Sequence, residues 1–204
     1  MYIPNLYRED DRKFLKSFMR QFSFATLITS ENETPIATHL PFVIEERDEK
    51  IILTTHMAEL NPQWKSFKNR TLVIFQEPHG YVSPTLYEKK VNVPTWNYIA
   101  VHAYGIPKIL EGNALKIEVL QKMFQSYEAA FKTQWEELPE KYKSALLQEI
   151  VAFEIEVTEI QGKQKLSQNK TFKERENIIN NFEKSGDGAA KSLAGFMKNY
   201  PFKK

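Results

Sequence analysis

The sequence predicts a mainly β fold with helices (α+β), in the form of a small antiparallel barrel with helical cover. Two observations lead to this class. Short β-rich runs, separated by turn residues, follow one another from Phe24 to Tyr104. Sequence with helical apolar spacing comes late, at about 112–148 and again after residue 170. Consecutive strands with helices set apart favour this class over a parallel α/β sheet.

The first predicted element is a helix over residues 11–22. Asp10 or Asp11 can cap its start. Its apolar face, at three- and four-residue spacing, consists of Phe14, Leu15, Phe18, Met19 and Phe22. We expect this helix to cover the open end of the sheet.

A meander of short strands is predicted next, at residues 24–29, 36–44, 51–55, 71–76 and 81–83. Pro35 and Pro41 flank the second run, which favours an edge or bulged strand over a central one. Pro78, His79 and Gly80 predict a turn between the last two runs.

Two later strands differ in their patterns. Residues 96–104 carry apolar or aromatic side chains on both faces, which indicates a central strand or a subunit interface. Residues 153–160 alternate apolar with polar, which is typical of a half-exposed strand. Between them lies helical sequence, with a second helix after Pro139.

The predicted domain organisation is a barrel domain over residues 1–170, with inserted helices at about 112–148, followed by a basic helical extension over 171–204. Ser185 to Gly188 divides this extension into two helices, the second beginning near Asp187. From Lys163 onward there are ten basic and four acidic residues. Such a tail could contact nucleic acid or an acidic partner, although a solvated helical face is the commoner explanation.

Composition excludes several functions. Without cysteine there is no disulfide, thiolate nucleophile or cysteine-ligated metal. The chain shows no leader-like start and no apolar run of membrane-spanning length, so we expect a cytoplasmic protein that does not bind membranes. The four histidines form no HxH or HExxH pattern, and Rossmann, P-loop and nucleophile-elbow glycine motifs are absent.

Polar clusters recur at predicted strand ends: Ala37–His39, Thr54–His56 with Asn61–Trp64, and Lys165–Lys170. If they converge, they form a donor-rich pocket with a fixed cation, which suits a phosphate-bearing cofactor. Tyr81, Trp96 and Tyr98 could supply planar walls for a ring system. Each cluster alone is a weak signal, and for the stretch from Thr54 to Trp64 an ordinary polar turn is the commoner explanation.

Ordered motifs along nearly the whole chain resemble the PaiB-like negative transcriptional regulators, a family of flavin-binding split-barrel proteins that also include pyridoxamine phosphate oxidases. The motifs are MYIP at 1–4, ATHLP at 37–41, His56 with NPQW at 61–64, Pro78 and His79 with YVSP at 81–84, VPTWNY at 93–98, and GKQKLSQN at 162–169. Glu77, Leu86 and Gln164 depart from the family pattern. Leu86 and Gln164 remove aromatic surface, so stacking or interface contacts there are expected to be weaker.

The resemblance implies a split β-barrel homodimer that binds flavin mononucleotide (FMN) at the subunit interface, with some pocket residues coming from the second subunit. It places Thr38 and His39 beside the flavin, and five residues around its phosphate and ribityl chain: Thr54, Thr55, His56, Asn61 and Gln63. The pocket would be completed by Trp64, Trp96, Asn97, Ser167, Gln168, Asn169 and Lys170.

Three functions follow as hypotheses. The first is an FMN-binding repressor of the kind that controls sporulation and protease synthesis, acting through DNA or a protein partner. The second is a flavin-dependent oxidoreductase of a small molecule. The third is a haem-binding protein in which His39 or His79 serves as axial ligand. No carboxylate pair or activated nucleophile is evident, so no catalytic residue is predicted.

Overall fold

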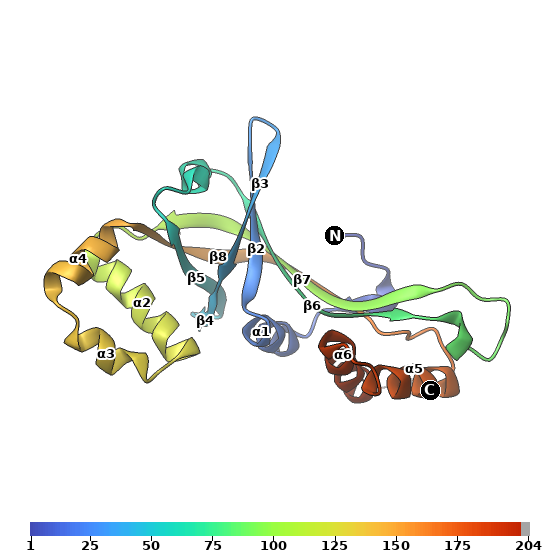
Figure 1. The fold of residues 1–204 in the computed structure, drawn as a ribbon. Helices are drawn as coiled ribbons and strands as arrows, with labels where there is room; N and C mark the ends of the chain where they lie inside the picture. The colour runs from blue at the N-terminus through green and yellow to red at the C-terminus, as the bar shows by residue number, and fades with distance from the viewer. Residues whose placement is uncertain (201–204) are drawn as a thin grey trace. The chain divides into compact units, whose positions relative to one another are not determined.

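The computed structural model describes residues 1–200 (Figure 1), which form two compact units. The terminal unit contains residues 1–11, 76–101 and 161–200, and the central unit contains residues 12–75 and 102–160. Three long strands contribute to both units: β6 (Thr71–Val82), β7 (Thr95–Ile109) and β8 (Ile150–Lys165). None of the helices in the described residues is long and apolar enough to cross a bilayer.

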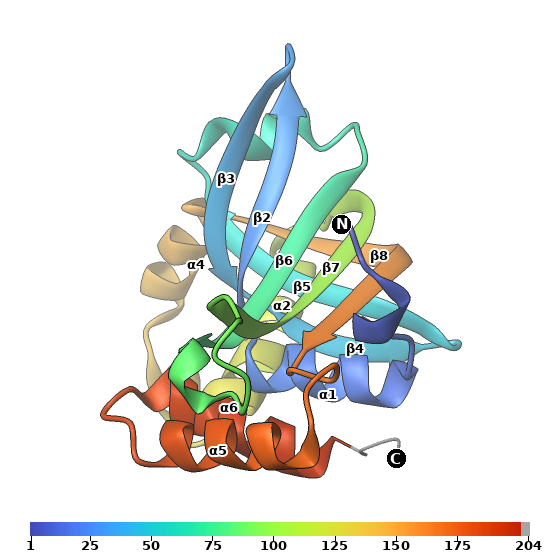
Figure 2. The ribbon, with the colours of Figure 1, turned by 90° about the vertical axis from the view of Figure 1, so that its right-hand side faces the viewer.

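The sheet contains eight strands in the order β3-β2-β6-β7-β8-β5-β4, with β1 (Arg8–Glu9) also paired to β8 (Figure 2). Its other strands are β2 (Phe24–Glu31), β3 (Thr34–Pro41), β4 (Val43–Arg47) and β5 (Lys50–Ala58). The pairs β2–β3, β2–β6, β4–β5 and β5–β8 are antiparallel. The sheet remains open, with β3 and β4 at its edges, and the predicted split-barrel class with helical cover is confirmed.

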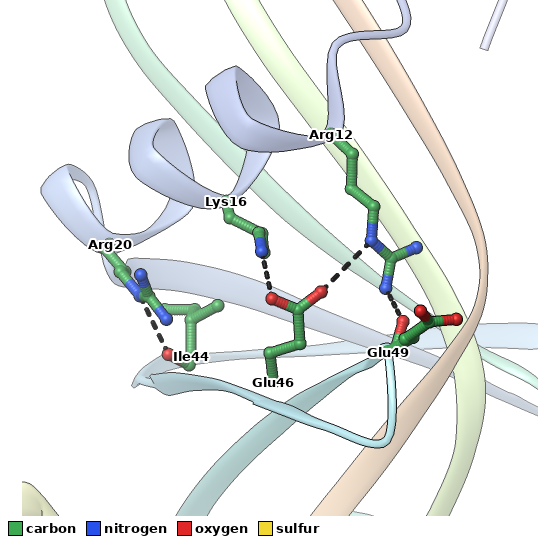
Figure 3. A network of polar contacts seen from close by, with 6 residues as sticks. All are labelled: Arg12, Lys16, Arg20, Ile44, Glu46 and Glu49. Carbon is green, nitrogen blue, oxygen red and sulfur yellow. Dashed lines mark hydrogen bonds and ion pairs between the residues drawn. The ribbon is translucent and has the colours of Figure 1, made fainter.

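In the central unit, α1 (Arg12–Gln21) is the predicted first helix, and it buries Leu15, Phe18 and Met19. Its polar side is fixed to the β4–β5 hairpin (Figure 3). Glu46 accepts hydrogen bonds from Lys16 and Arg12, and Arg20 Nε donates to the carbonyl of Ile44 at 3.0 Å. The hydrogen bond from Lys16 is the main cause that lowers the pKa of Glu46.

Three helices lie between β7 and β8: α2 (Asn113–Tyr127), α3 (Phe131–Glu137) and α4 (Glu140–Gln148). Val119 and Met123 of α2 form an apolar cluster with Val43 and Ala152, which fixes this helix against the sheet strands of the central unit. Trp135 is buried beside Phe124, with ring centroids 5.4 Å apart. These contacts explain the late apolar stripe in the sequence.

In the terminal unit, α5 (Phe172–Glu183) packs against α6 (Gly188–Asn199) (Figure 1). Thr171 and Glu174 form a capping box at the start of α5. Asp187 caps α6 by accepting from the backbone amide of Ala189 at 2.8 Å, where the sequence places that helix start. Residues 201–204 of the predicted basic extension lie outside the described residues, and the domain boundary at residue 170 stays a prediction.

Three details of the strand prediction are wrong. The strands do not form the predicted meander, because β2 pairs with β6 as well as with β3, and β5 pairs with β8 instead of β6. The run 36–44 is divided at Phe42, because β3 pairs with β2 whereas β4 pairs with β5. The turn predicted at Pro78–Gly80 is absent, and β6 continues to Val82. A Cβ atom at Gly80 would lie 2.8 Å from the ring of Phe182, so this glycine allows the close approach of α5 to the strand. The edge position predicted for the second run is confirmed for β3.

Candidate functional site

The fourteen predicted flavin contacts divide between the two units. The central unit holds Thr38, His39, Thr54, Thr55, His56, Asn61, Gln63 and Trp64, and the terminal unit holds Trp96, Asn97, Ser167, Gln168, Asn169 and Lys170. Within each unit, hydrogen bonds connect several of these residues to one another or to the backbone. Their assignment to a flavin stays a prediction.

In the central unit, the start of the short helix η2 (Pro62–Ser66) joins Asn61, Gln63 and Thr38. Asn61 accepts from the backbone amide of Gln63 and donates to Thr38 Oγ1, both at 3.0 Å. The buried Gln63 amide donates to the carbonyls of Leu27 and Ile36, while its Oε1 has no partner among the described residues. This network attaches η2 to β2 and β3.

On β5, three consecutive predicted residues have different surroundings. Thr54 and Thr55 are buried; Thr55 Oγ1 donates to the carbonyl of Pro41 at 2.6 Å, whereas Thr54 Oγ1 has no partner among residues 1–200. Nδ1 of His56 lies 3.1 Å from Met123 Sδ, and burial lowers the pKa of this imidazole. At neutral pH His56 is therefore a neutral group.

His39 and Trp64 are more accessible than these residues. The exposed His39 stacks on Phe24, with ring centroids 6.3 Å apart and planes 23° from parallel. Trp64 is half-buried, and its indole N–H donates to the carbonyl of Glu59 at 2.9 Å. The central unit thus presents one exposed and one partly exposed ring beside a hydrogen-bonded polar network.

In the terminal unit, the turn after β8 is fixed to β7. Asn97 Nδ2 donates to Ser167 Oγ at 2.9 Å, and Ser167 Oγ donates to Asn97 Oδ1 at 3.1 Å. Ser167 has a φ of 58°, a left-handed conformation that non-glycine residues rarely adopt. Gln168 turns back to its own segment, where it accepts from the amide of Leu166 and donates to the carbonyl of Gln164.

Trp96 precedes Asn97 on β7, so its side chain lies on the opposite face of the strand. It is 52% exposed and forms an aromatic cluster with Tyr81 and His79 of β6, at centroid distances of 5.8 and 5.9 Å. The terminal unit therefore separates its predicted contacts into a buried polar group and an exposed aromatic cluster.

The buried polar group borders a cavity of about 220 Å³ in the terminal unit. Its walls include the predicted residues Asn97, Ser167, Asn169 and Lys170. They also include residues outside the predicted site: Tyr7, Tyr87, Asn92, Val93, Pro94, Thr95 and Lys165. Lys165 belongs to the polar strand-end cluster recognised in the sequence, and Thr95 lies in the motif VPTWNY, whereas Tyr87 carries no signal in the pattern.

The cavity is electropositive. Lys165 Nζ donates to Thr95 Oγ1, and Lys170 Nζ donates to Asn92 Oδ1 at 2.9 Å and lies 3.7 Å from the centre of the Tyr87 ring. Burial is the main cause that lowers the pKa of Lys165, followed by the charge of Lys163. Such an arrangement of ammonium groups, an amide and hydroxyls can hold an oxyanion by charge-assisted hydrogen bonds.

The described residues contain no group of three or more His, Asp and Glu side chains placed to hold a metal ion. The donor groups instead fit a flavin nucleotide, which needs cations and hydrogen-bond donors for its phosphate and accessible rings for its planar system. In the central unit, the buried atoms Thr54 Oγ1 and Gln63 Oε1 have no partner among the described residues and remain available for hydrogen bonds.

Comparison with known proteins also indicates flavin binding. A family model described as "Putative FMN-binding domain" matches residues 1–159. The chain is 38% identical over 203 residues to the protease synthase and sporulation protein PAI 2 of Bacillus subtilis (strain 168), covering 98% of this chain and 97% of that protein.

Two solved structures share the fold at low sequence identity. A flavocytochrome from Azotobacter vinelandii has a TM-score of 0.62 at 15% identity, covering 78% of this chain and 69% of that chain. A FAD and heme binding protein from Mycobacterium smegmatis has a TM-score of 0.62 at 13% identity, covering 78% and 73%. At these identities, the likeness concerns the fold alone.

Proposed function

Because this chain belongs to the FMN-binding domain family and is similar over its whole length to PAI 2, we propose that it is a PaiB-like, FMN-dependent regulator of gene expression. The observation that carries the proposal is the 38% identity over 98% of the chain to a protein named for protease synthesis and sporulation. The proposed action is repression of protease synthesis and sporulation, through DNA or a protein partner.

FMN is the cofactor that the family membership supports. In our proposal the fourteen predicted residues contact it, some of them from the second subunit. Exposed rings such as Trp96 supply apolar surface for the isoalloxazine. The flavin's state then serves as a signal for the regulator.

The regulator acts as a homodimer in this proposal. The aromatic cluster of His79, Tyr81 and Trp96 supports it, since the Tyr81 and Trp96 side chains are 50% and 52% exposed. Val93, on the connection that leads into β7, is 77% exposed and adds apolar surface. A second copy of the chain would cover such surface, as homodimer interfaces are richer in apolar area than the remaining surface.

Flavin binding is tested by the visible absorption spectrum of the purified protein, before and after addition of excess FMN and removal of the unbound fraction. We expect flavin bands at near one FMN per chain. Trp96→Ala and Lys170→Ala should weaken FMN binding, whereas Lys191→Ala, on the exposed side of α6, should not. A protein that retains no FMN would contradict the proposal.

The oligomeric state is measured on the same samples by light scattering, where a monomer at all concentrations would contradict the dimer.

Regulation is tested by complementation. The chain is expressed in a Bacillus subtilis strain that lacks PAI 2, and extracellular protease activity and spore counts are measured. We expect both to return toward the level of the parent strain. No change in either phenotype would contradict the regulatory role.

A route through DNA is tested by selecting genomic fragments and measuring the salt dependence of their binding. The variants are Lys184→Gln and Lys191→Gln, on exposed positions of the basic segment.

The other two hypotheses are distinguished by the same samples. NADH or NADPH oxidation by the FMN-loaded protein would favour a flavin oxidoreductase. A Soret band that appears on adding haem, and that His39→Ala or His79→Ala removes, would favour haem binding.

A further inference from the structure

We propose that the cavity of the terminal unit is a binding site for a phosphate group, in which Lys165, Lys170 and Tyr87 contact the phosphate oxygens. The roles of Lys165 and Tyr87 go beyond the residues assigned to the flavin. The inference stands on the geometry of this cavity and does not require FMN to be the ligand.

The first observation is the charge of the walls. Two lysines line the cavity, and its walls in the described residues include no aspartate or glutamate. Each ammonium group has a neutral protein partner, the Thr95 hydroxyl for Lys165 and the Asn92 amide for Lys170. These neutral oxygens leave the two positive charges uncompensated, and further donor hydrogens remain on each ammonium for a ligand.

The second observation is an unused polar group. Tyr87 lines the cavity and is only 8% exposed, and its buried hydroxyl has no hydrogen-bond partner among residues 1–200. A buried hydroxyl without a partner is unfavourable, so such groups usually mark a ligand, an ion or an ordered water. The charge of Glu174 acts on Tyr87, but the two carboxylate oxygens of Glu174 accept hydrogen bonds from the backbone amides of Thr171 and Glu88. Glu174 is therefore not a hydrogen-bond partner of the Tyr87 hydroxyl.

The third observation is the rigid support of the site. The reciprocal hydrogen bonds between Asn97 and Ser167 fix the turn that carries Lys170, and the Ser167 carbonyl accepts from the Lys170 amide at 3.1 Å. Lys165 is placed by β8, which pairs with β1 in this unit. Both cations are therefore held by backbone that does not need to reorganise on binding.

The size of the cavity limits the ligand. About 220 Å³ is below the roughly 300–1,000 Å³ of pockets that enclose drug-sized molecules. A phosphate group fits, whereas a complete flavin would leave most of its atoms outside. The two cations match a phosphate dianion better than a single carboxylate. The phosphate can belong to FMN or to a separate phosphorylated molecule, and experiment distinguishes these sources.

The test measures binding of inorganic phosphate, FMN and riboflavin to the full chain by calorimetry and flavin fluorescence. The variants are Lys165→Gln, which can keep the contact with Thr95, and Tyr87→Phe, which keeps the ring. Lys191→Gln, on the exposed side of α6, is the matched control. Thermal unfolding of each variant verifies folding, and Lys170→Gln replaces Lys165→Gln if the latter does not fold.

We expect Lys165→Gln to weaken phosphate binding about tenfold or more and Tyr87→Phe about two- to tenfold, as for lost charged and neutral hydrogen bonds. If FMN affinity falls in parallel while riboflavin affinity is unchanged, the phosphate is that of FMN. If FMN affinity is unchanged, the site takes a separate phosphorylated ligand.

Phosphate binding that is absent, or that Lys191→Gln weakens as much as Lys165→Gln does, would overturn the inference. Phosphate binding that persists in a chain unable to hold FMN would refute the proposed cofactor function and leave this site standing. The two failures are therefore distinguishable.

Discussion

Asn97 and Ser167, 70 positions apart in the sequence, exchange two hydrogen bonds inside the terminal unit. Ser167 adopts a left-handed backbone conformation at the end of β8, and Asn97 lies near the start of β7. The side-chain amide of Asn97 thus stabilises a backbone conformation of Ser167 that a serine seldom adopts by itself. This pair connects the motif WNY to the motif LSQN.

We predict that Asn97→Ala destabilises the protein by about 1–3 kcal/mol, because it leaves the buried Ser167 hydroxyl unpaired and removes the support for its φ angle. Urea unfolding measures the change. Asn180→Ala, at an exposed position of α5, is the control and should change stability by less than about 0.5 kcal/mol. Equal effects of the two substitutions would show that the pair contributes nothing specific.

Gln63→Met is predicted to be more destabilising than a typical surface change, by about 2–4 kcal/mol. The buried amide donates to two carbonyls and to the Thr29 hydroxyl, and methionine keeps the volume but none of these bonds. Gln63→Glu should also destabilise, because it replaces the donor by a buried charge. A Gln63→Met protein with wild-type unfolding would mean that these bonds are not needed to attach η2.

Glycine positions give a contrast between close packing and open space. A Cβ at Gly105 would lie 2.3 Å from the carbonyl oxygen of Glu156, so Gly105→Ala should cost about 1–3 kcal/mol or more. Gly195 lies within α6 with nothing within 4 Å of an added Cβ, so Gly195→Ala should stabilise by up to about 1 kcal/mol. Thermal unfolding compares the two, and the same sign of effect would contradict the packing argument.

Acid stability should depend on two half-buried histidines, His56 and His102. Burial lowers the pKa of His56 and of His102, so the unfolded chain takes up protons below its ordinary pKa of 6.5 while the folded protein still resists them. Their stabilising contribution is present above pH 6.5 and is lost as pH falls toward the folded pKa values. The free energy of unfolding should fall by at most about 1.4 kcal/mol per pH unit per histidine.

Urea titrations between pH 5 and 8 measure this slope. His56→Gln should reduce it, because one of the two titrating groups is removed, whereas Asn180→Gln should not. A slope that is the same in all three proteins would show that His56 is not involved.

Local sequence patterns predict much of the fold because the responsible contacts are local. The apolar spacing of Leu15, Phe18 and Met19 locates α1, and Asp187 marks the start of α6. The same reasoning fails at Gly80, where a residue typical of turns lies inside β6 because Phe182 packs on it. That contact joins positions about a hundred residues apart, so no local pattern contains it.

The sequence by itself determined the antiparallel class through the periodicity of its strands. Its ordered motifs indicated the family by resemblance, and the resemblance implied the FMN cofactor. The sequence also identified Lys165 and Ser167 as part of a polar strand end. Only the tertiary structure decided that Tyr87 and Thr95 join them around one electropositive cavity, and that Trp96 packs beside His79 and Tyr81. The physical reason is that strand pairing and helix packing bring together side chains whose separation along the chain carries no periodic signal.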